Sequence, residues 1–289
     1  MHISEINIYP IKSLKGIPLD SALVEERGLQ YDRRWMLTDT ENRFLTQREF
    51  PSMATIAVRV ENGELRVESE GQGAMSIPFE PEIENRKPVT IWKSVCDGLL
   101  YDRDVNEWFS DAIGTKCQLV YMPDDSRRRV NPLFNKHDDV VSFADGYPLM
   151  LLSEASLDDL NYRIDRNENA DEGVRVPLPM KRFRPNLVVS GSDPFAEDNW
   201  QRIRVGEAIF RSTKPCERCV ITTIDPSTGE FAGKEPLRTL ASFRKARDVM
   251  PDLYATFGVD PNGVLFGQNL IAESIGATIQ VGDQVEVIA

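Results

Sequence analysis

The strongest signal for the fold is a hairpin in the first half of the chain, in the segment MATIAVRVENGELRV, residues 53–67. Apolar and β-branched runs flank Asn62-Gly63, and Asn-Gly between such runs is typical of a tight antiparallel turn. One helix is expected in this half, from a cap at Asp104 to a stop at Gly114. The half therefore favours an antiparallel barrel or sandwich. Further short apolar runs lie at 3–9, 22–24, 35–37, 44–45, 75–79, 89–92 and 99–102.

The second half of the chain carries more helix. A polar stretch with two prolines and three consecutive arginines, residues 123–139, separates the halves. Beyond it, leucines at helical spacing predict helices over 153–167, capped by its first serine, and over 235–247. We expect a mainly β protein with helices (α+β), made of two β-rich domains over residues 1–120 and 121–289. Further strands are expected at 183–190, 203–211 and 220–225, with a hairpin over 279–288.

Composition and charge exclude several classes of protein. The 289 residues contain 34 Lys and Arg against 46 Asp and Glu, and the net charge of −12 argues against nucleic acid or anionic lipid as the main partner. No apolar run reaches the roughly 18 residues of a membrane span, and the N-terminus does not read as a secretory signal. Four cysteines do not suggest a disulfide framework, so we expect a cytoplasmic protein. Two histidines, His2 and His137, leave little for His-rich metal sites or Ser–His triads.

The cysteine pair in PCERC, residues 215–219, lies between two expected strands and admits four interpretations. Half a zinc site would need further Cys or His ligands nearby. A redox pair would normally open a helix, whereas residues 220–223 are largely β-branched. The two cysteines could also be small packing residues. The fourth interpretation is a single thiolate that acts as nucleophile or metal ligand, with Arg218 beside it to favour the ionised sulfur.

Basic residues gather in short groups despite the acidic total. Each group alone is most often a solvated surface, but several that converged would bind an anion such as phosphate. Ser13 and Asn186 would add neutral hydrogen-bond donors to such a site. Asp145, on its own, is most simply a turn residue before Gly146. The groups are Lys12 with Lys15, Arg33 with Arg34, Arg127 to Arg129, and Lys181 with Arg182 and Arg184.

Seven segments in order resemble one known family. They are 9–16 (YPIKSLKG), 32–35 (DRRW), 142–148 (SFADGYP), 183–191 (FRPNLVVSG), 215–226 (PCERC, then TTIDP), 235–240 (EPLRTL) and 266–269 (FGQN). The set is similar to that of the MOSC-domain molybdoenzymes, namely the mitochondrial amidoxime-reducing component and bacterial reductases of N-hydroxylated bases. The resemblance covers essentially the whole chain. It implies an N-terminal β-barrel domain followed by a MOSC domain, which is a pyruvate-kinase-like β-barrel with helices.

The resemblance also implies a cofactor and its site. The metal of a molybdenum cofactor would be bound by the pterin dithiolene and by one thiolate, Cys219, and soft sulfur ligands suit this metal. Asp145 would lie beside the metal as a catalytic acid. Glu217 departs from relatives that often carry Ser, and Asn269 replaces a Tyr of the animal enzymes. Positions matching cofactor-binding residues are Lys12, Ser13, Arg33, Arg184, Asn186, Arg218 and Asn269.

The activity implied by the resemblance is the molybdenum-dependent reduction of amidoximes and N-hydroxylated bases to the amidine or amine and water. The alternative is a non-catalytic carrier of the cofactor or of sulfur, because MOSC domains also occur fused to sulfurases. Close bacterial relatives continue into a ferredoxin-like domain, whereas this chain has no cysteine cluster for an iron–sulfur centre. Electrons would therefore come from a separate ferredoxin- or flavoprotein-like donor, unless the chain is part of a longer protein.

Overall fold

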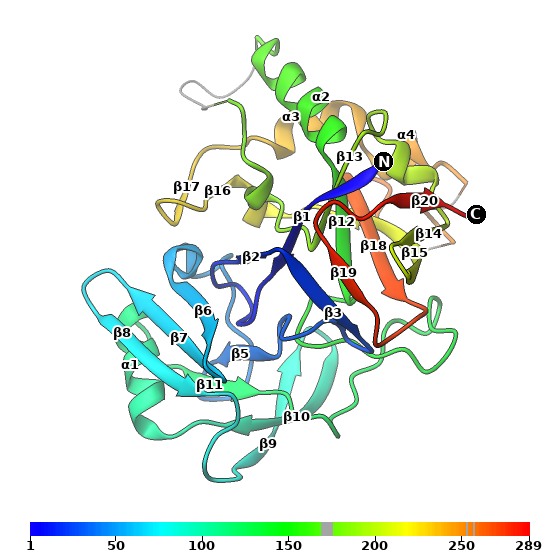
Figure 1. The fold of residues 1–289 in the computed structure, drawn as a ribbon. Coiled ribbons are helices and arrows are strands. Elements are labelled where there is room, and N and C mark those ends of the chain that lie inside the picture. The colour runs from blue at the N-terminus through cyan, green and yellow to red at the C-terminus, as the bar shows by residue number, and fades with distance from the viewer. Residues whose placement is uncertain (169–175, 253, 257) are drawn as a thin grey trace.

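The computed structural model describes residues 1–168, 176–252, 254–256 and 258–289 (Figure 1). Most of its regular structure is β-strand with a few helices, which confirms the fold class expected from the sequence. The strand pairings of the described residues leave each sheet with two open ends. The expectation that each domain is a closed barrel therefore stays a prediction, as does the division at residue 120.

An eight-stranded sheet joins the two ends of the chain (Figure 1). β1 pairs antiparallel with β13, so that Ile3 lies opposite Val189, while β12 and β13 run parallel. This pairing brings residues 9–16, which follow β1, next to residues 183–186, which precede β13. The strand order is β2 (Ile17–Leu19), β1 (His2–Ile8), β13 (Leu187–Ser190), β12 (Leu149–Ser153), β18 (Leu265–Ala272), β15 (Ala208–Glu217), β14 (Arg202–Val205) and β20 (Val285–Val287).

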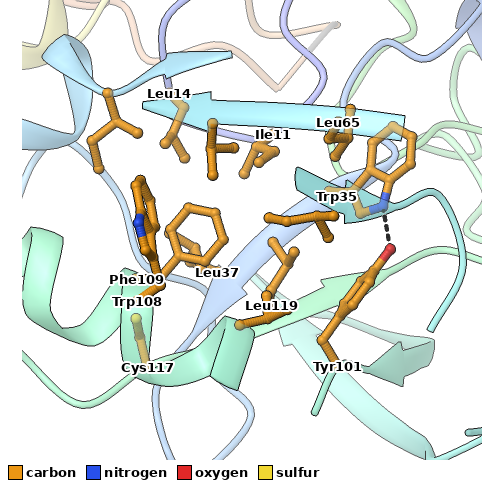
Figure 2. Close-up of a cluster of buried hydrophobic side chains, with 14 of the residues drawn as sticks. Ile11, Leu14, Trp35, Leu37, Leu65, Tyr101, Trp108, Phe109, Cys117 and Leu119 are labelled. Carbon is orange, nitrogen blue, oxygen red and sulfur yellow. Dashed lines mark hydrogen bonds between the residues drawn. The ribbon is translucent and has the colours of Figure 1, made fainter. Parts of the chain in front are cut away.

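Two smaller sheets and a helix enclose a second core. Figure 2 shows its side chains, among them Trp35, Phe109 and Leu119, which are almost completely buried. The Trp35 indole N–H donates to the Tyr101 hydroxyl at 2.9 Å, so the polar atoms of these two rings are paired inside the core. The elements are β5 (Trp35–Thr38), β11 (Gln118–Tyr121), β10 (Ser94–Leu100) and β9 (Arg86–Ile91) in one sheet, β6 (Ala57–Glu61), β7 (Glu64–Ser69) and β8 (Gly73–Pro78) in the other, and α1 (Arg103–Ile113).

The predicted hairpin is confirmed. β6 and β7 pair across Asn62 and Gly63, whose φ angles of 52° and 81° suit a tight hairpin turn. The first residues of the segment, however, belong to a 3-10 helix, η1 (Pro51–Thr55). The predicted cap of α1 is also wrong: the Asp102 carboxylate, two residues earlier, accepts a hydrogen bond from the Val105 backbone N–H at 3.1 Å.

The helices of the second half follow the predicted leucine pattern with one break. Ser153 caps α2 (Glu154–Asp165) as expected. The helix expected over 235–247 is two pieces, α3 (Leu237–Phe243) and α4 (Ala246–Val249). The break occurs because the Arg244 carbonyl accepts a hydrogen bond from the Leu265 N–H of β18 instead of continuing the helix.

Two predicted strand segments differ from the structure. Residues 220–225 form a 3-10 helix, η4 (Val220–Thr223), followed by the short strand β16 (Ile224–Asp225). The Thr222 and Thr223 hydroxyls donate to carbonyls three residues earlier, which favours a turn over an extended chain. The expected terminal hairpin is also wrong, because β19 (Thr278–Gln280) pairs with β3 while β20 pairs with β14.

The remaining elements are short strands and 3-10 helices. Within the described residues, no helix has the length and apolar character needed to cross a membrane. These elements are β3 (Ser21–Glu25), β4 (Gly28–Leu29), β17 (Glu230–Phe231), η2 (Met180–Arg182) and η3 (Ala196–Asn199).

Candidate functional site

One cavity of about 150 Å³ collects residues from both halves of the chain. Its walls are built by the loops after β1, β4, β5 and β11, by the segment before β13, by residues of β12 and β18, and by the end of β15 with the loop that follows it. Every site residue that the sequence singled out lines this cavity, although the residues lie up to 257 positions apart. They are Lys12, Ser13, Arg33, Asp145, Arg184, Asn186, Arg218, Cys219 and Asn269.

Three of these residues have a left-handed backbone that side chains rarely adopt. The φ angles of Ser13, Arg33 and Arg184 are 67°, 50° and 56°. Such conformations cost about 1–3 kcal/mol each and are found where the surroundings fix them, often at binding sites. Here the Arg33 N–H donates to the Tyr9 carbonyl at 3.0 Å, and the Gln47 amide donates to the Ser13 carbonyl at 2.6 Å. The strained turns lie where the two halves of the chain meet.

One end of the cavity, which we call the thiolate end, consists of Lys12, Arg48, Asp145 and Cys219. Lys12 forms an ion pair with Asp145. Burial lowers the pKa of Lys12 to about 8, although the Asp145 charge opposes this effect. Burial works against ionisation of Asp145, but the charges of Lys12 and Arg48 outweigh it and hold the Asp145 pKa below its usual range. Asp145 is therefore an ionised carboxylate at neutral pH.

Arg48 is the site residue that sequence reasoning missed. Its Nη2 lies 3.2 Å from the Cys219 sulfur and 3.6 Å from Asp145 Oδ2, so one nitrogen links the two groups. Its guanidinium also lies over the Trp92 ring, 4.8 Å from the centroid. Arg48 stands outside the basic groups that drew attention in the sequence. The fold alone brings it to a sulfur 171 residues away.

The two cysteines of the pair have different surroundings. The Arg218 guanidinium, expected beside Cys219, lies at Cys216 instead: its Nη1 lies 3.1 Å from the Cys216 sulfur and its Nη2 donates to the Phe183 carbonyl at 2.6 Å. Cys216 packs against an apolar cluster that includes Phe183. Both cysteines line the cavity, but Arg48 contacts only the Cys219 sulfur. Among the described residues, no group of three or more His, Cys, Asp or Glu side chains is arranged to hold a metal ion.

The other end, which we call the anion end, consists of Tyr9, Arg33, Arg182 and Arg184. The guanidinium carbons of Arg33 and Arg184 lie 4.4 and 4.1 Å from the centroid of the buried Tyr9 ring. Arg33 is paired with Asp32 at 2.6 Å. Arg184 has no hydrogen-bond or ion-pair partner for its guanidinium within the described residues, and burial lowers its pKa to about 10. Arg184 is thus a cation without a compensating acid.

Arg182 adds unsatisfied donors to the anion end. Its side chain is 5% exposed, and its Nε and Nη1 have no hydrogen-bond partner in the described part of the chain. Only its Nη2 approaches an acid, Asp225, at 3.8 Å. Arg182 and Arg184 also line a second cavity of about 440 Å³ that adjoins the first. Buried N–H groups normally have partners, so these donors indicate a place for an anionic ligand.

Two expected ligand positions turn out to be engaged within the protein. The Asn186 amide accepts from Arg33 Nη1 at 2.9 Å and donates to the Asn7 carbonyl at 3.1 Å, so it orients Arg33. Glu217 accepts from Lys214 Nζ at 2.7 Å, and this ion pair offsets its negative charge. The Asn269 amide donates to the Lys214 carbonyl at 3.1 Å.

Comparison with known proteins places the chain in a family. A model described as the MOSC N-terminal beta barrel domain matches residues 1–116, and one described as the MOSC domain matches residues 138–286. The chain belongs to the MOSC family, which confirms the resemblance seen in the sequence.

The similar curated proteins are of two kinds. A molybdenum cofactor sulfurase of Oryza sativa subsp. japonica is 35% identical over 99% of this chain, which spans only 35% of that protein. Mitochondrial amidoxime-reducing component 1 is 32% identical in both Mus musculus and Homo sapiens, over 99% of this chain and 82% of the relative.

Proposed function

We propose that the chain binds a molybdenum cofactor and reduces N-hydroxylated compounds, namely amidoximes and N-hydroxylated bases, to the amidine or amine and water. The observation that carries the proposal is the thiolate end: the Cys219 sulfur and the Asp145 carboxylate share Arg48 at one end of a basic cavity. The names of the amidoxime-reducing relatives, over most of their length, favour the same activity.

The residues present fit an anionic cofactor with a sulfur-bound metal. Arg182 has two buried N–H groups without a partner in the described residues, and the nearby Arg184 guanidinium stacks on Tyr9. Such guanidinium groups bind phosphate oxygens well. Cys219 supplies a soft sulfur ligand, as the metal requires. In this proposal Cys219 holds the metal, Arg184 and Arg182 hold the phosphate, and Asn186 keeps Arg33 in place beside them.

The bound cofactor supplies the two electrons that cleave the N–O bond. The balanced change is R–NH–OH + 2 e⁻ + 2 H⁺ → R–NH₂ + H₂O, so the protein must deliver protons. Asp145 is ionised at neutral pH, whereas Lys12 carries a proton that it can release near pH 8. We infer that one of the two protons passes from Lys12 through the Asp145 carboxylate to the leaving oxygen, that the second comes from solvent, and that Asp145 is the group in contact with the substrate.

A separate protein would deliver the electrons, and a ferredoxin- or flavoprotein-like donor is our proposal for it. The cytoplasmic location expected from the sequence stays a prediction, since the amidoxime-reducing relatives are named as mitochondrial proteins. From the charge and hydropathy of the sequence we still expect that the protein binds neither nucleic acid nor a membrane.

The second candidate is a non-catalytic carrier of the cofactor or of sulfur, which the match to the rice sulfurase favours. The two candidates predict different results for protein made in a host that synthesises the cofactor. Molybdenum content and the reduction of benzamidoxime, with reduced methyl viologen as electron source, are measured on the same sample. We expect bound molybdenum and turnover. Bound molybdenum without turnover would favour the carrier. A protein with no bound molybdenum and no turnover would refute both candidate functions.

A further inference from the structure

Trp92 differs from the other tryptophans of the chain. Trp35, Trp108 and Trp200 are at most 8% exposed, whereas Trp92 is 49% exposed. It lies in the turn between β9 and β10 with a φ of 53°, a left-handed conformation that is rare for bulky residues. An exposed indole gains little from burial, so core packing does not explain why this side chain occupies a strained position.

The indole is held against the thiolate end of the cavity. Its Nε1–H donates to Asp145 Oδ1 at 3.3 Å, and the Arg48 guanidinium lies over its ring. The Phe44 ring supports it with a centroid separation of 5.0 Å. Arg48 and Asp145 both line the cavity, and Arg48 touches the Cys219 sulfur. Arg48 thus lies between the exposed Trp92 ring and the Cys219 sulfur and contacts both.

We propose that Trp92 is a substrate-positioning residue whose exposed indole stacks on planar, aryl-bearing N-hydroxylated compounds. This inference rests on the proposed function and adds a substrate class to it: aryl amidoximes and N-hydroxylated aromatic bases over small aliphatic ones. An aromatic ring stacked on Trp92 directs the attached N–OH toward Asp145, because the indole N–H and the substrate share that carboxylate. Stacking of this kind is sensitive to removal of either ring.

The first test is binding, which requires no turnover. Trp92 is the one exposed tryptophan, so a ligand stacked on it quenches a component of the fluorescence that Trp92→Phe removes. The holoprotein is titrated with benzamidoxime and with acetamidoxime, which lacks the aryl ring. We expect saturable quenching by benzamidoxime and at least about tenfold weaker binding of acetamidoxime. Equal affinities, or quenching that persists unchanged in Trp92→Phe, would overturn the proposal.

The second test separates binding from chemistry, with reduced methyl viologen as the electron source so that no donor protein is involved. Trp92→Ala should raise KM for benzamidoxime about tenfold, change kcat less than about threefold, and leave KM for acetamidoxime and the molybdenum content unaltered. Trp92→Phe should restore KM to within about threefold of wild type. Trp92→Gly removes the ring but suits the left-handed backbone, so it checks that strain or misfolding is not the cause.

Tyr162→Ala serves as the matched control, since Tyr162 is an exposed aromatic residue on α2 whose ring lies under Arg166 and not under Arg48. Its kinetic constants should equal those of wild type. A wild type that reduces both compounds while Trp92→Ala behaves identically would overturn the role of Trp92 and leave the proposed function standing. If the wild-type protein reduces neither compound, the proposed function is refuted. The fluorescence test then decides on Trp92 alone: quenching by benzamidoxime but not by acetamidoxime supports the stacking site, and the lack of such quenching overturns it.

Discussion

The two ends of the cavity differ in how their charges are compensated. At the thiolate end, Lys12 and Arg48 both approach the Asp145 carboxylate, and Arg48 also contacts the Cys219 sulfur. At the anion end, Arg184 stacks on Tyr9 without an acid, and Arg182 keeps two buried N–H groups unpaired among the described residues. The charges of the thiolate end are thus largely matched within the chain, and we propose that a ligand supplies negative charge at the anion end.

The largest effect is expected at the cysteines. Cys219→Ser should lose essentially all bound molybdenum and all turnover, because the serine hydroxyl is a poor substitute for a soft thiolate. Cys216→Ala should keep most of both, because Cys216 packs against Phe183 and is held by Arg218 outside the thiolate end. Molybdenum content and benzamidoxime reduction are measured for both variants. Equal loss in the two would return the pair to a zinc or redox interpretation.

Asp145→Asn is expected to separate the two properties that the thiolate end combines. An amide cannot pass a proton, so turnover should fall about 100-fold or more. Molybdenum content should stay near wild type, because the anion end and Cys219 are untouched. Element analysis and turnover on the same preparation check this. Full activity in the variant would make Asp145 only the turn residue before Gly146.

Arg184→Ala tests the anion end in the same way. Without the unpaired guanidinium, the retained molybdenum should fall about tenfold, since a charge-assisted phosphate contact is lost. The pterin released from purified protein by oxidation measures this independently of activity. Arg204→Ala, which breaks an exposed ion pair with Glu286, is the control and should change nothing. An Arg184→Ala protein with a full cofactor complement would show that the cation has another purpose.

The smallest effect is a pH dependence that originates from Lys12. Its pKa of about 8 means that the protonated form dominates at pH 7 and is lost as the pH rises. Turnover that depends on this proton should drop by about fourfold between pH 7 and pH 8.5. Lys12→Arg should abolish this alkaline decline, because a guanidinium stays protonated throughout the range. A wild-type rate that stays constant over this range would exclude Lys12 as the proton source.

Rising pH should affect stability through Lys12 in the opposite direction to its effect on turnover. The pKa of Lys12 is lower in the folded protein than the usual lysine value of 10.5, so the unfolded chain binds more protons between about pH 8 and pH 10.5. The contribution of Lys12 to stability therefore increases with rising pH in that window. The free energy of unfolding is measured with urea for wild type and Lys12→Met at pH 7 and at pH 9.5. The free energy of wild type relative to that of the variant should be higher at pH 9.5 than at pH 7.

Local signals in the sequence were sufficient for part of the fold. Asn62-Gly63 predicts its hairpin because the turn chemistry lies within two residues. The segment 220–223 was misjudged as a strand, because the bonds from the Thr222 and Thr223 hydroxyls outweigh β-branched propensity. The pairing of β1 with β13 connects residues more than 180 positions apart, and no local pattern contains that information.

Local patterns also predict only part of the site. The ordered motifs single out nine residues, and all of them line one cavity. The sequence does not identify Arg48 as a site residue, because it is an isolated arginine whose partners, Asp145 and Cys219, are distant in sequence. Arg218 was assigned to the wrong sulfur, since adjacency along the chain does not decide which way a guanidinium points.

We propose that Cys219, and not Cys216, is the one protein ligand to the metal. A crystal of the cofactor-loaded protein, measured at the molybdenum absorption edge, tests it most directly through the anomalous difference map. The account predicts one peak within bonding distance of Cys219 Sγ, with Cys216 Sγ still against Phe183. A peak shared by both sulfurs, or one outside the cavity, would contradict it.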